Sequence, residues 1–343
     1  MRDDKTMYFF RRIALYDIAD SELNSFKDKY IFTTRAWLSF LEESQAGESA
    51  IIRIEKEGAL VGFLYGRIVT KLGIRIFGSP FSGWSTCYMG LALLEEDKLT
   101  LIREASEYIL KDLRCLYAEI IDREISLEQA TAAGFKALPV DTLQLDFEQY
   151  ESDDSLMLRC KTKCRNTIRQ FEKRGATLEI VANPDDAFVD EYYDQLTDVF
   201  AKQGLLPTYD KNRVASLIEH LKGTDTLLCL RVRDPNGQSI ATSIFFGYGY
   251  TFYFWGGASY RFGQKYLPNE YMLWTAIRYF RDKGMTSFDM VGVRDYKRKF
   301  GSEERRYAKI VLTRYDWLLW MRDLAQKAFF VLLRVKGWIK GKR

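Results

Sequence analysis

Residues 288–307, FDMVGVRDYKRKFGSEERRY, pass abruptly from a buried-strand pattern to a dense run of cations. In an extended chain, successive side chains point to opposite faces, so Tyr296 and Arg298 would share one side. Lys297 and Lys299 would then share the other side. We therefore expect one lysine to face a cleft while its neighbours meet solvent. A fully solvated charged loop is the alternative.

The segments before this stretch repeat an element order that already occurs in the first half of the chain. In both halves, helical patterns alternate with strands, and a strand meander is followed by a helix and a further strand. An acidic segment without apolar periodicity, residues 151–154, separates the two halves. We therefore predict an α+β protein with a first domain at 1–150 and a second domain at 151–315.

The overall composition excludes several classes of protein and site. The net charge of +4 arises from 51 basic and 47 acidic residues, so an anionic partner must be met by local clusters of cations. Five scattered cysteines favour a reducing compartment, and no apolar run approaches the roughly 20 residues of a membrane span, so we expect a cytoplasmic protein. The single histidine, His220, argues against catalytic triads and most zinc sites, and we expect no metal.

A basic ridge is predicted on the first helix of the second half, at 155–174. Its cations recur at every fourth position: Lys161, Arg165, Arg169 and Lys173. Cys160 and Cys164 fall on one apolar face of this helix, where core packing is a simpler interpretation than a metal site. Like charges at this spacing repel one another, so the ridge either binds a phosphate-bearing ligand or is exposed to water.

A second anion site is predicted where a strand gives way to a helix. The strand ends at Gly256-Gly257, and Pro268 suits the first position of a helix. Backbone amides near Asn269 can hold an anion, and Arg261 lies in the loop before them. An ordinary strand-to-helix loop is the alternative.

Residues 252–307 resemble the C-terminal acyltransferase domain of the Fem-type peptidyltransferases and the BioF-like branch of the GNAT superfamily. The motifs that carry the resemblance are Gly257-Ala258-Ser259, Pro268-Asn269, Gly284, Phe288-Asp289 and the run from Tyr296 to Gly301. The resemblance extends over 155–312, and more weakly into the first half through Trp37, Ser79-Pro80 and Gly83-Trp84.

This resemblance implies two GNAT-like domains in tandem, each with a mixed, largely antiparallel sheet flanked by helices. It also implies acyl transfer to an amine, with no tightly bound cofactor. Fem-type members take an aminoacyl group from charged tRNA to a cell-wall precursor, whereas GNAT relatives use acyl-CoA. Only Arg261 and Gly263 match the usual GNAT pyrophosphate loop, which makes acyl-CoA the less favoured donor.

The resemblance also implies roles for individual residues. Lys297 matches the motif lysine that would stabilise the tetrahedral oxyanion, and Tyr296 replaces a phenylalanine of the family. Asp289 or Asp295 would accept a proton from the amine, unless the substrate does so itself. The residues expected to bind donor or acceptor are Lys161, Arg165, Arg169, Lys173, Arg261, Asn269 and Lys299.

The last segment, 316–343, predicts a basic amphipathic helix. Its tryptophans and terminal cations suit an anionic membrane surface, and packing back onto the domain is the alternative. Together these features predict a Fem-like acyltransferase, cytoplasmic or peripheral at the inner face of the cell membrane, that forms an amide on an amine of an envelope precursor or glycoconjugate of peptidoglycan or exopolysaccharide. The alternatives are an acyl-CoA-dependent GNAT N-acetyltransferase acting on a sugar or amino-acid amine, and a non-catalytic module that binds RNA or anionic lipid.

Overall fold

The structure is a computed structural model that describes residues 8–26, 30–81, 83, 86–94, 96–315, 317, 318, 320, 322 and 324. Within these residues the chain forms two compact units. The first runs to Val140 and is resumed at Arg306, and the second runs from Asp141 to Arg305. Strands β9 (Lys136–Asp146) and β15 (Glu303–Thr313) therefore contain residues of both units. The predicted α+β class is confirmed.

Unit 1 contains two sheets. The order of the first, which is antiparallel, is β1 (Tyr8–Ile13), β3 (Ile51–Lys56), β4 (Ala59–Leu64) and β7 (Leu91–Leu93). The order of the second is β15, β8 (Tyr117–Asp122), β6 (Ile74–Ser79), β5 (Arg67–Lys71) and β2 (Glu48–Ser49). Strands β6 and β8 are parallel, and the other neighbours in this second sheet are antiparallel.

The α-helices of unit 1 are α1 (Asp20–Leu23), α2 (Arg35–Ser44), α3 (Lys98–Glu107) and α4 (Leu127–Ala132). The 3-10 turns are η1 (Leu15–Asp17) and η2 (Ile31–Thr33), and the segment η3 (Tyr108–Asp112) is π-helical. Helix α2 begins after Thr34, whose side chain accepts a hydrogen bond from the backbone N–H of Trp37. Helix α3 buries Leu101, Ile102 and Ala105 in a core that includes residues of both sheets.

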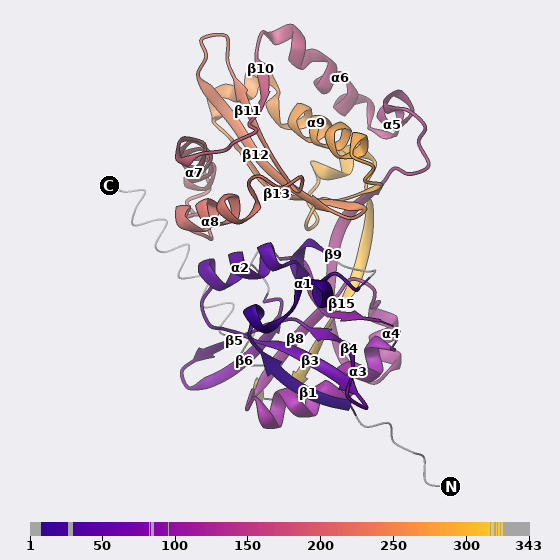
Figure 1. Ribbon diagram of the computed structural model, residues 1–343. Coiled ribbons are helices and arrows are strands. Elements are labelled where there is room, and N and C mark those ends of the chain that lie inside the picture. The colour runs from indigo at the N-terminus through magenta and orange to yellow at the C-terminus, as the bar shows by residue number, and fades with distance from the viewer. Residues whose placement is uncertain are drawn as a thin grey trace. The chain divides into compact units, whose positions relative to one another are not determined.

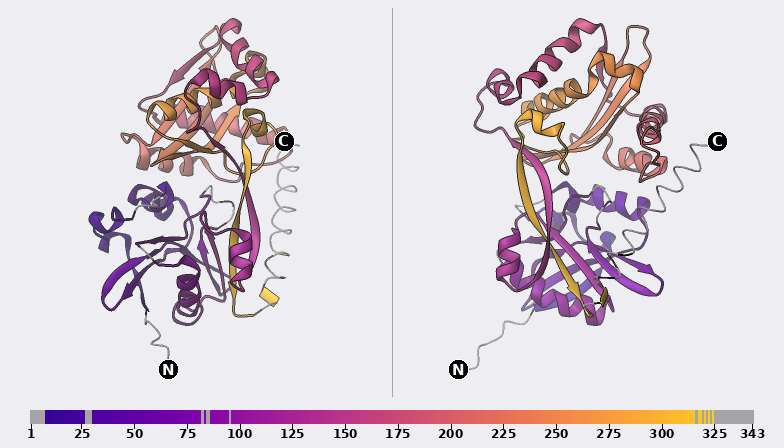
Figure 2. Two further views of the ribbon diagram at one scale, coloured as in Figure 1. Left: turned by 90° about the vertical axis from the view of Figure 1, so that its right-hand side faces the viewer. Right: turned by 180° about the vertical axis from the view of Figure 1, so that it is seen from behind.

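Unit 2 is built on one sheet, in the order β10 (Thr177–Ile180), β11 (Leu227–Arg233), β12 (Ser239–Tyr248), β13 (Thr251–Ser259), β14 (Ser287–Asp289) and β9. Among the described strand pairs of this unit, only β13–β14 is parallel. Helices α7 (Asp186–Ala201) and α8 (Lys211–Leu221) lie on one face, and α6 (Thr162–Phe171) and α9 (Pro268–Asp282) lie on the other (Figures 1 and 2). Helix α5 (Asp153–Arg159) and the turns η4 (Glu172–Arg174), η5 (Arg261–Tyr266) and η6 (Lys297–Phe300) complete the unit.

The single helix predicted at 155–174 is two helices in the structure. Cys160 has extended backbone angles (ψ 142°) at the end of α5, and α6 starts at Thr162. Between them, the backbone N–H of Lys161 donates to the carbonyl of Lys299 at 2.8 Å. The Lys161 N–H therefore bonds to a residue distant in sequence instead of to a carbonyl of the preceding helical turn. The periodicity of the segment does not reveal this break.

The core of unit 2 fixes the position of β13 against β14. The ring centroid of Phe252 lies 4.1 Å from that of Phe288 and 4.6 Å from that of Phe280. Phe147, the residue that follows β9, completes the group at 6.2 Å from Phe252, and all four side chains are buried. Stacked, fully buried rings supply much of the stability of a core of this kind.

Most of the predicted C-terminal helix at 316–343 lies outside the described residues, as does Trp84. In the part of the chain that the structure describes, none of the helices is both long enough and apolar enough to cross a membrane.

Candidate active site

The parallel strands β13 and β14 separate near the middle of β13. Their paired residues are Thr251 with Ser287, Phe252 with Phe288 and Tyr253 with Asp289. Beyond Tyr253, β13 continues to Ser259, while β14 has ended. Backbone groups on a diverging strand are suited to hydrogen bonding with a ligand.

A bulge in β13 lies directly at this point of separation. Ile244 of β12 pairs with Gly256, and the next residue, Phe245, pairs with Phe254. Trp255 is therefore the extra residue in β13. Bulges bend a strand and redirect its side chains, so this one contributes to the opening between β13 and β14.

Lys297 is buried at this opening. Its side-chain ammonium donates to the carbonyls of Met290 at 2.5 Å and Val291 at 2.7 Å, and it lies 5.4 Å from the centre of the Phe254 ring. Lys297 is 4% exposed, although it belongs to the short 3-10 helix η6 and not to an extended strand. The expectation that one lysine of the run points inward agrees with this geometry. The strand-like alternation of side chains from which we inferred it does not apply, because the residues are helical.

Asp289 holds the turn on which those two carbonyls lie. Its Oδ1 accepts from the Thr142 hydroxyl at 2.6 Å and from the Val291 backbone N–H at 2.9 Å. The N–H of Gly292 also donates to the Thr142 hydroxyl at 3.1 Å. Val291 and Gly292 both have positive φ, 57° and 77°, and β14 ends before them, at Asp289. The fully buried Asp289 therefore shapes the backbone that positions Lys297.

The two residues before Lys297 lie nearer the surface. The Asp295 side chain is fully exposed, and its carboxylate is 3.9 Å from Nε of Arg298. Tyr296 is partly exposed, and the Lys297 ammonium lies 5.8 Å from its ring centre. Desolvation of its hydroxyl raises the pKa of Tyr296 to about 12, so this group is protonated at neutral pH.

The start of α9 offers a poor site for a pyrophosphate. Pro268 at the first helical position has no N–H to donate, and Glu270 places a carboxylate in the first turn. That carboxylate is 2.9 Å from the ammonium of Lys299. Asn269 and Arg261, the other predicted anion contacts in this region, are exposed.

The predicted basic ridge contains one residue with a structural task. Lys161, Arg169 and Lys173 are exposed. Arg165 instead donates to the carbonyls of Leu158 at 3.2 Å and Cys160 at 2.5 Å, at the end of α5. A cation that binds these last carbonyls stabilises the junction between α5 and α6.

Replacing Arg165 by alanine is expected to lower the free energy of unfolding by about 1 kcal/mol, because two carbonyls at the helix junction lose a charged donor. The matched change Arg169→Ala, on the exposed part of the same helix, is expected to stay within about 0.5 kcal/mol of the wild type. Urea unfolding followed by circular dichroism measures both values. Equal effects of the two substitutions would show that the Arg165 contacts contribute nothing specific.

A second buried cluster, on the α7–α8 face of β13, was not foreseen from the sequence. The hydroxyls of Tyr192 and Tyr209 are 2.9 Å apart, and the Arg213 guanidinium lies 5.7 Å and 5.6 Å from the ring centres of Tyr209 and Trp255. Burial lowers the pKa of Arg213 to about 10. A Cβ at Gly256 would lie 2.5 Å from the Tyr192 hydroxyl, so glycine is needed for this close approach. Trp255 before two glycines was the available signal in the sequence.

Comparison with known proteins shows what this part of the chain resembles. Residues 159–298 match the sequence profile of the acetyltransferase (GNAT) domain. This segment is similar to a GNAT domain. It contains the bulged strand β13, the turn after β14 and Lys297 itself. No curated protein matches the sequence.

Solved structures extend the likeness over most of the chain. FemX has a TM-score of 0.66 at 14% identity, with 88% of this chain and 97% of FemX covered. The C-terminal domain of a putative lysylphosphatidylglycerol synthetase from Agrobacterium fabrum has a TM-score of 0.57 at 13% identity, covering 91% and 97%. A tandem GNAT protein from the clavulanic acid pathway has a TM-score of 0.53 at 10% identity, covering 90% and 98%. At these identities the similarity concerns the fold, and the predicted tandem GNAT-like fold is confirmed.

Proposed function

We propose that this protein is a Fem-like acyltransferase that transfers an aminoacyl group from charged tRNA to an amine of a cell-envelope precursor or glycoconjugate, in the cytoplasm at the inner face of the membrane. The observation that carries the proposal is the position of Lys297. Its ammonium is buried, is fixed by two backbone carbonyls and lies where β13 and β14 separate, within the GNAT-type segment.

In this reaction the acceptor amine attacks the ester carbonyl of the aminoacyl-tRNA. The carbonyl oxygen becomes an oxyanion, and a fixed cation in a water-poor site stabilises that charge. The new C–N bond forms, the C–O bond to the tRNA ribose breaks, and the proton lost by the amine goes to the ribose oxygen that leaves. Lys297 supplies the cation without any loss or gain of a proton.

Asp289 acts as a positioning residue in this proposal. Its carboxylate accepts hydrogen bonds from Thr142 and Val291 and so holds the turn whose carbonyls bind Lys297. Because the proton of the amine goes to the ribose oxygen that leaves, neither Asp289 nor the exposed Asp295 needs to accept it.

Two features support aminoacyl-tRNA as the donor. The start of α9 carries a proline and a carboxylate, which disfavours the pyrophosphate of acyl-CoA. Exposed cations at Lys161, Arg169 and Lys173 suit the phosphates of a nucleic acid. The match to an acetyltransferase domain favours the second candidate, an acyl-CoA-dependent N-acetyltransferase acting on a sugar or amino-acid amine.

Binding of bulk aminoacyl-tRNA and of acetyl-CoA, measured side by side over a salt series, tests the donor. We expect tRNA binding to weaken as the salt concentration rises. In the double variant Arg169→Gln and Lys173→Gln, the slope of log K against log salt concentration should become shallower by about one for each phosphate contact removed. The control is Lys111→Gln, an exposed cation of unit 1. Saturable acetyl-CoA binding without tRNA binding would favour the acetyltransferase. Binding of tRNA without deacylation in the presence of amine-bearing envelope precursors would favour a non-catalytic module.

A further inference from the structure

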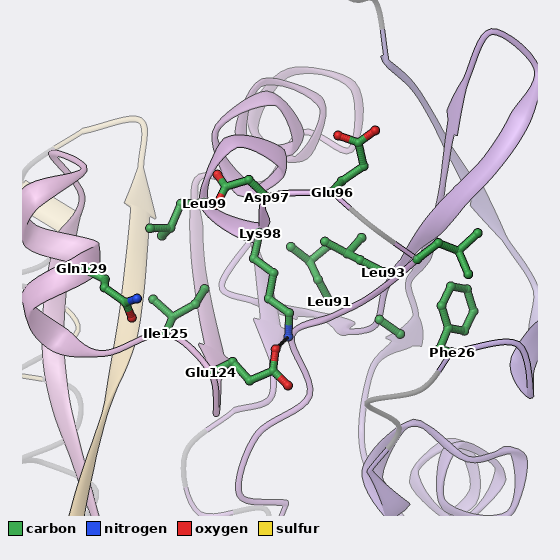
Figure 3. A pocket seen from close by; sticks show the side chains of 12 residues that line it. Phe26, Leu91, Leu93, Glu96, Asp97, Lys98, Leu99, Glu124, Ile125 and Gln129 are labelled. Atoms are coloured by element: carbon green, nitrogen blue, oxygen red, sulfur yellow. Dashed lines mark ion pairs between the residues drawn. The ribbon is translucent and has the colours of Figure 1, made fainter.

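Unit 1 contains a pocket of about 370 Å³. It lies among β7, the first turn of α3 and the chain segments that join β8 to α4 (Figure 3). Its apolar walls are formed by Phe26, Leu91, Leu93, Leu94, Leu99 and Ile125. Pockets of this size accommodate small organic molecules.

The pocket exists because β7 and β8 belong to different sheets. The chain just before β7 is linked to β8 by the hydrogen bond from the Met89 N–H to the Ile121 carbonyl, at 3.1 Å. Two residues further along, the Leu91 N–H donates to the Asp122 side-chain carboxylate at 3.0 Å, and not to a backbone carbonyl of β8. Gly90 between them has φ 58°, and a Cβ there would lie 2.2 Å from Asp122 Oδ2. The divergence is therefore built into the backbone.

Carboxylates outnumber cations around this pocket. Lys98 lies 3.0 Å from both oxygens of Asp122 and 2.7 Å from Glu124, and Figure 3 shows it reaching from α3 toward Glu124. Glu96 pairs with Lys56 at 3.0 Å. The charged residues that line the pocket are Glu96, Asp97, Lys98 and Glu124, so three carboxylates and one ammonium group leave its lining with a net formal charge of −2.

The first turn of α3 does not offset this negative charge. The Asp97 carboxylate accepts the hydrogen bond of the Thr100 N–H at 2.7 Å and so occupies the helix start with an anion. A phosphate or carboxylate entering the pocket would meet Asp97, Glu96 and Glu124 at its rim. Such a ligand is disfavoured by repulsion, whereas a cation is attracted.

We propose that this pocket binds a small amine-bearing ligand with an apolar body, whose ammonium group lies near Glu124 and Asp97 and whose hydrocarbon portion packs on Leu93, Leu99 and Ile125. Charge complementarity selects the ammonium group, and burial of apolar surface supplies affinity. The inference concerns unit 1 alone and does not depend on the transfer reaction proposed for unit 2.

Three probes of equal length but different charge test this site: hexylammonium, 1-hexanol and hexanoate. Titration calorimetry on the full-length protein at neutral pH is expected to show saturable binding of hexylammonium. The other two probes lack the positive charge and should bind at least about tenfold more weakly. A tenfold difference in Kd corresponds to about 1.4 kcal/mol. Hexanol binding as tightly as hexylammonium, or hexanoate binding more tightly, would overturn the proposal.

Variants locate the binding in this pocket. Glu124→Gln and Asp97→Asn are each expected to weaken hexylammonium binding at least about fivefold. Asparagine at position 97 can still cap α3, so Asp97→Asn remains a usable test if Glu124→Gln fails to fold. The control is Glu107→Gln in the same helix, an exposed carboxylate that pairs with Lys111. Loss of affinity in both pocket variants and not in the control supports the assignment. Equal affinities in all three variants would exclude it.

Discussion

Replacing Lys297 by alanine is expected to lower kcat for amide formation about 10²–10³-fold and to change the Kd for the acyl donor less than about threefold. The loss follows from removing a fixed cation that stabilises the oxyanion, an interaction made in the transition state and not in the ground state. Single-turnover formation of the amide measures kcat, and donor binding is measured separately with the same protein.

The neighbouring change Arg298→Ala serves as the control. Arg298 is partly exposed and pairs with Glu304, and its loss should leave kcat within about twofold of the wild type. Because Lys297 also bonds two carbonyls, its removal will cost some stability, so thermal unfolding is recorded for every variant. A folded Lys297→Ala protein with unchanged kcat would contradict the assigned role.

Replacing Phe252 by alanine is expected to lower the free energy of unfolding of unit 2 by about 3–5 kcal/mol. Phe252 is fully buried and stacks with both Phe280 and Phe288, so truncation leaves a cavity among rings that are held by three different elements. Phe252 also pairs with Phe288 in the register that fixes β13 against β14. We therefore expect kcat to fall together with stability. Urea unfolding followed by tryptophan fluorescence measures the change.

Phe262→Ala provides the matched comparison for this substitution. Phe262 lies in the turn η5, is 48% exposed and stacks on Tyr260 alone among the described aromatic pairs. Its truncation should cost less than about 1 kcal/mol. If the two alanine substitutions prove equally costly, the stacked core is not what stabilises unit 2.

Part of the candidate site could be predicted from the sequence, because its signals are local or are carried by a motif. The Tyr296–Gly301 run marked Lys297, and the structure buries that residue at the separation of β13 and β14. The same run could not reveal that Asp289 and Thr142 shape the turn, because Thr142 lies far away in the sequence on β9. The cluster of Tyr192, Tyr209 and Arg213 was missed for the same reason.

The sequence by itself determined the α+β class and the regular elements. Helix α8 illustrates this, because its apolar periodicity and its Asp210 cap both act within one segment. Only the tertiary structure decided the break between α5 and α6, where the Lys161 N–H bonds to the Lys299 carbonyl. It also decided that Arg165 binds helix carbonyls and that β7 and β8 diverge to form a pocket. These features depend on hydrogen bonds and close contacts that form only when the chain is folded. Local sequence patterns therefore do not predict them.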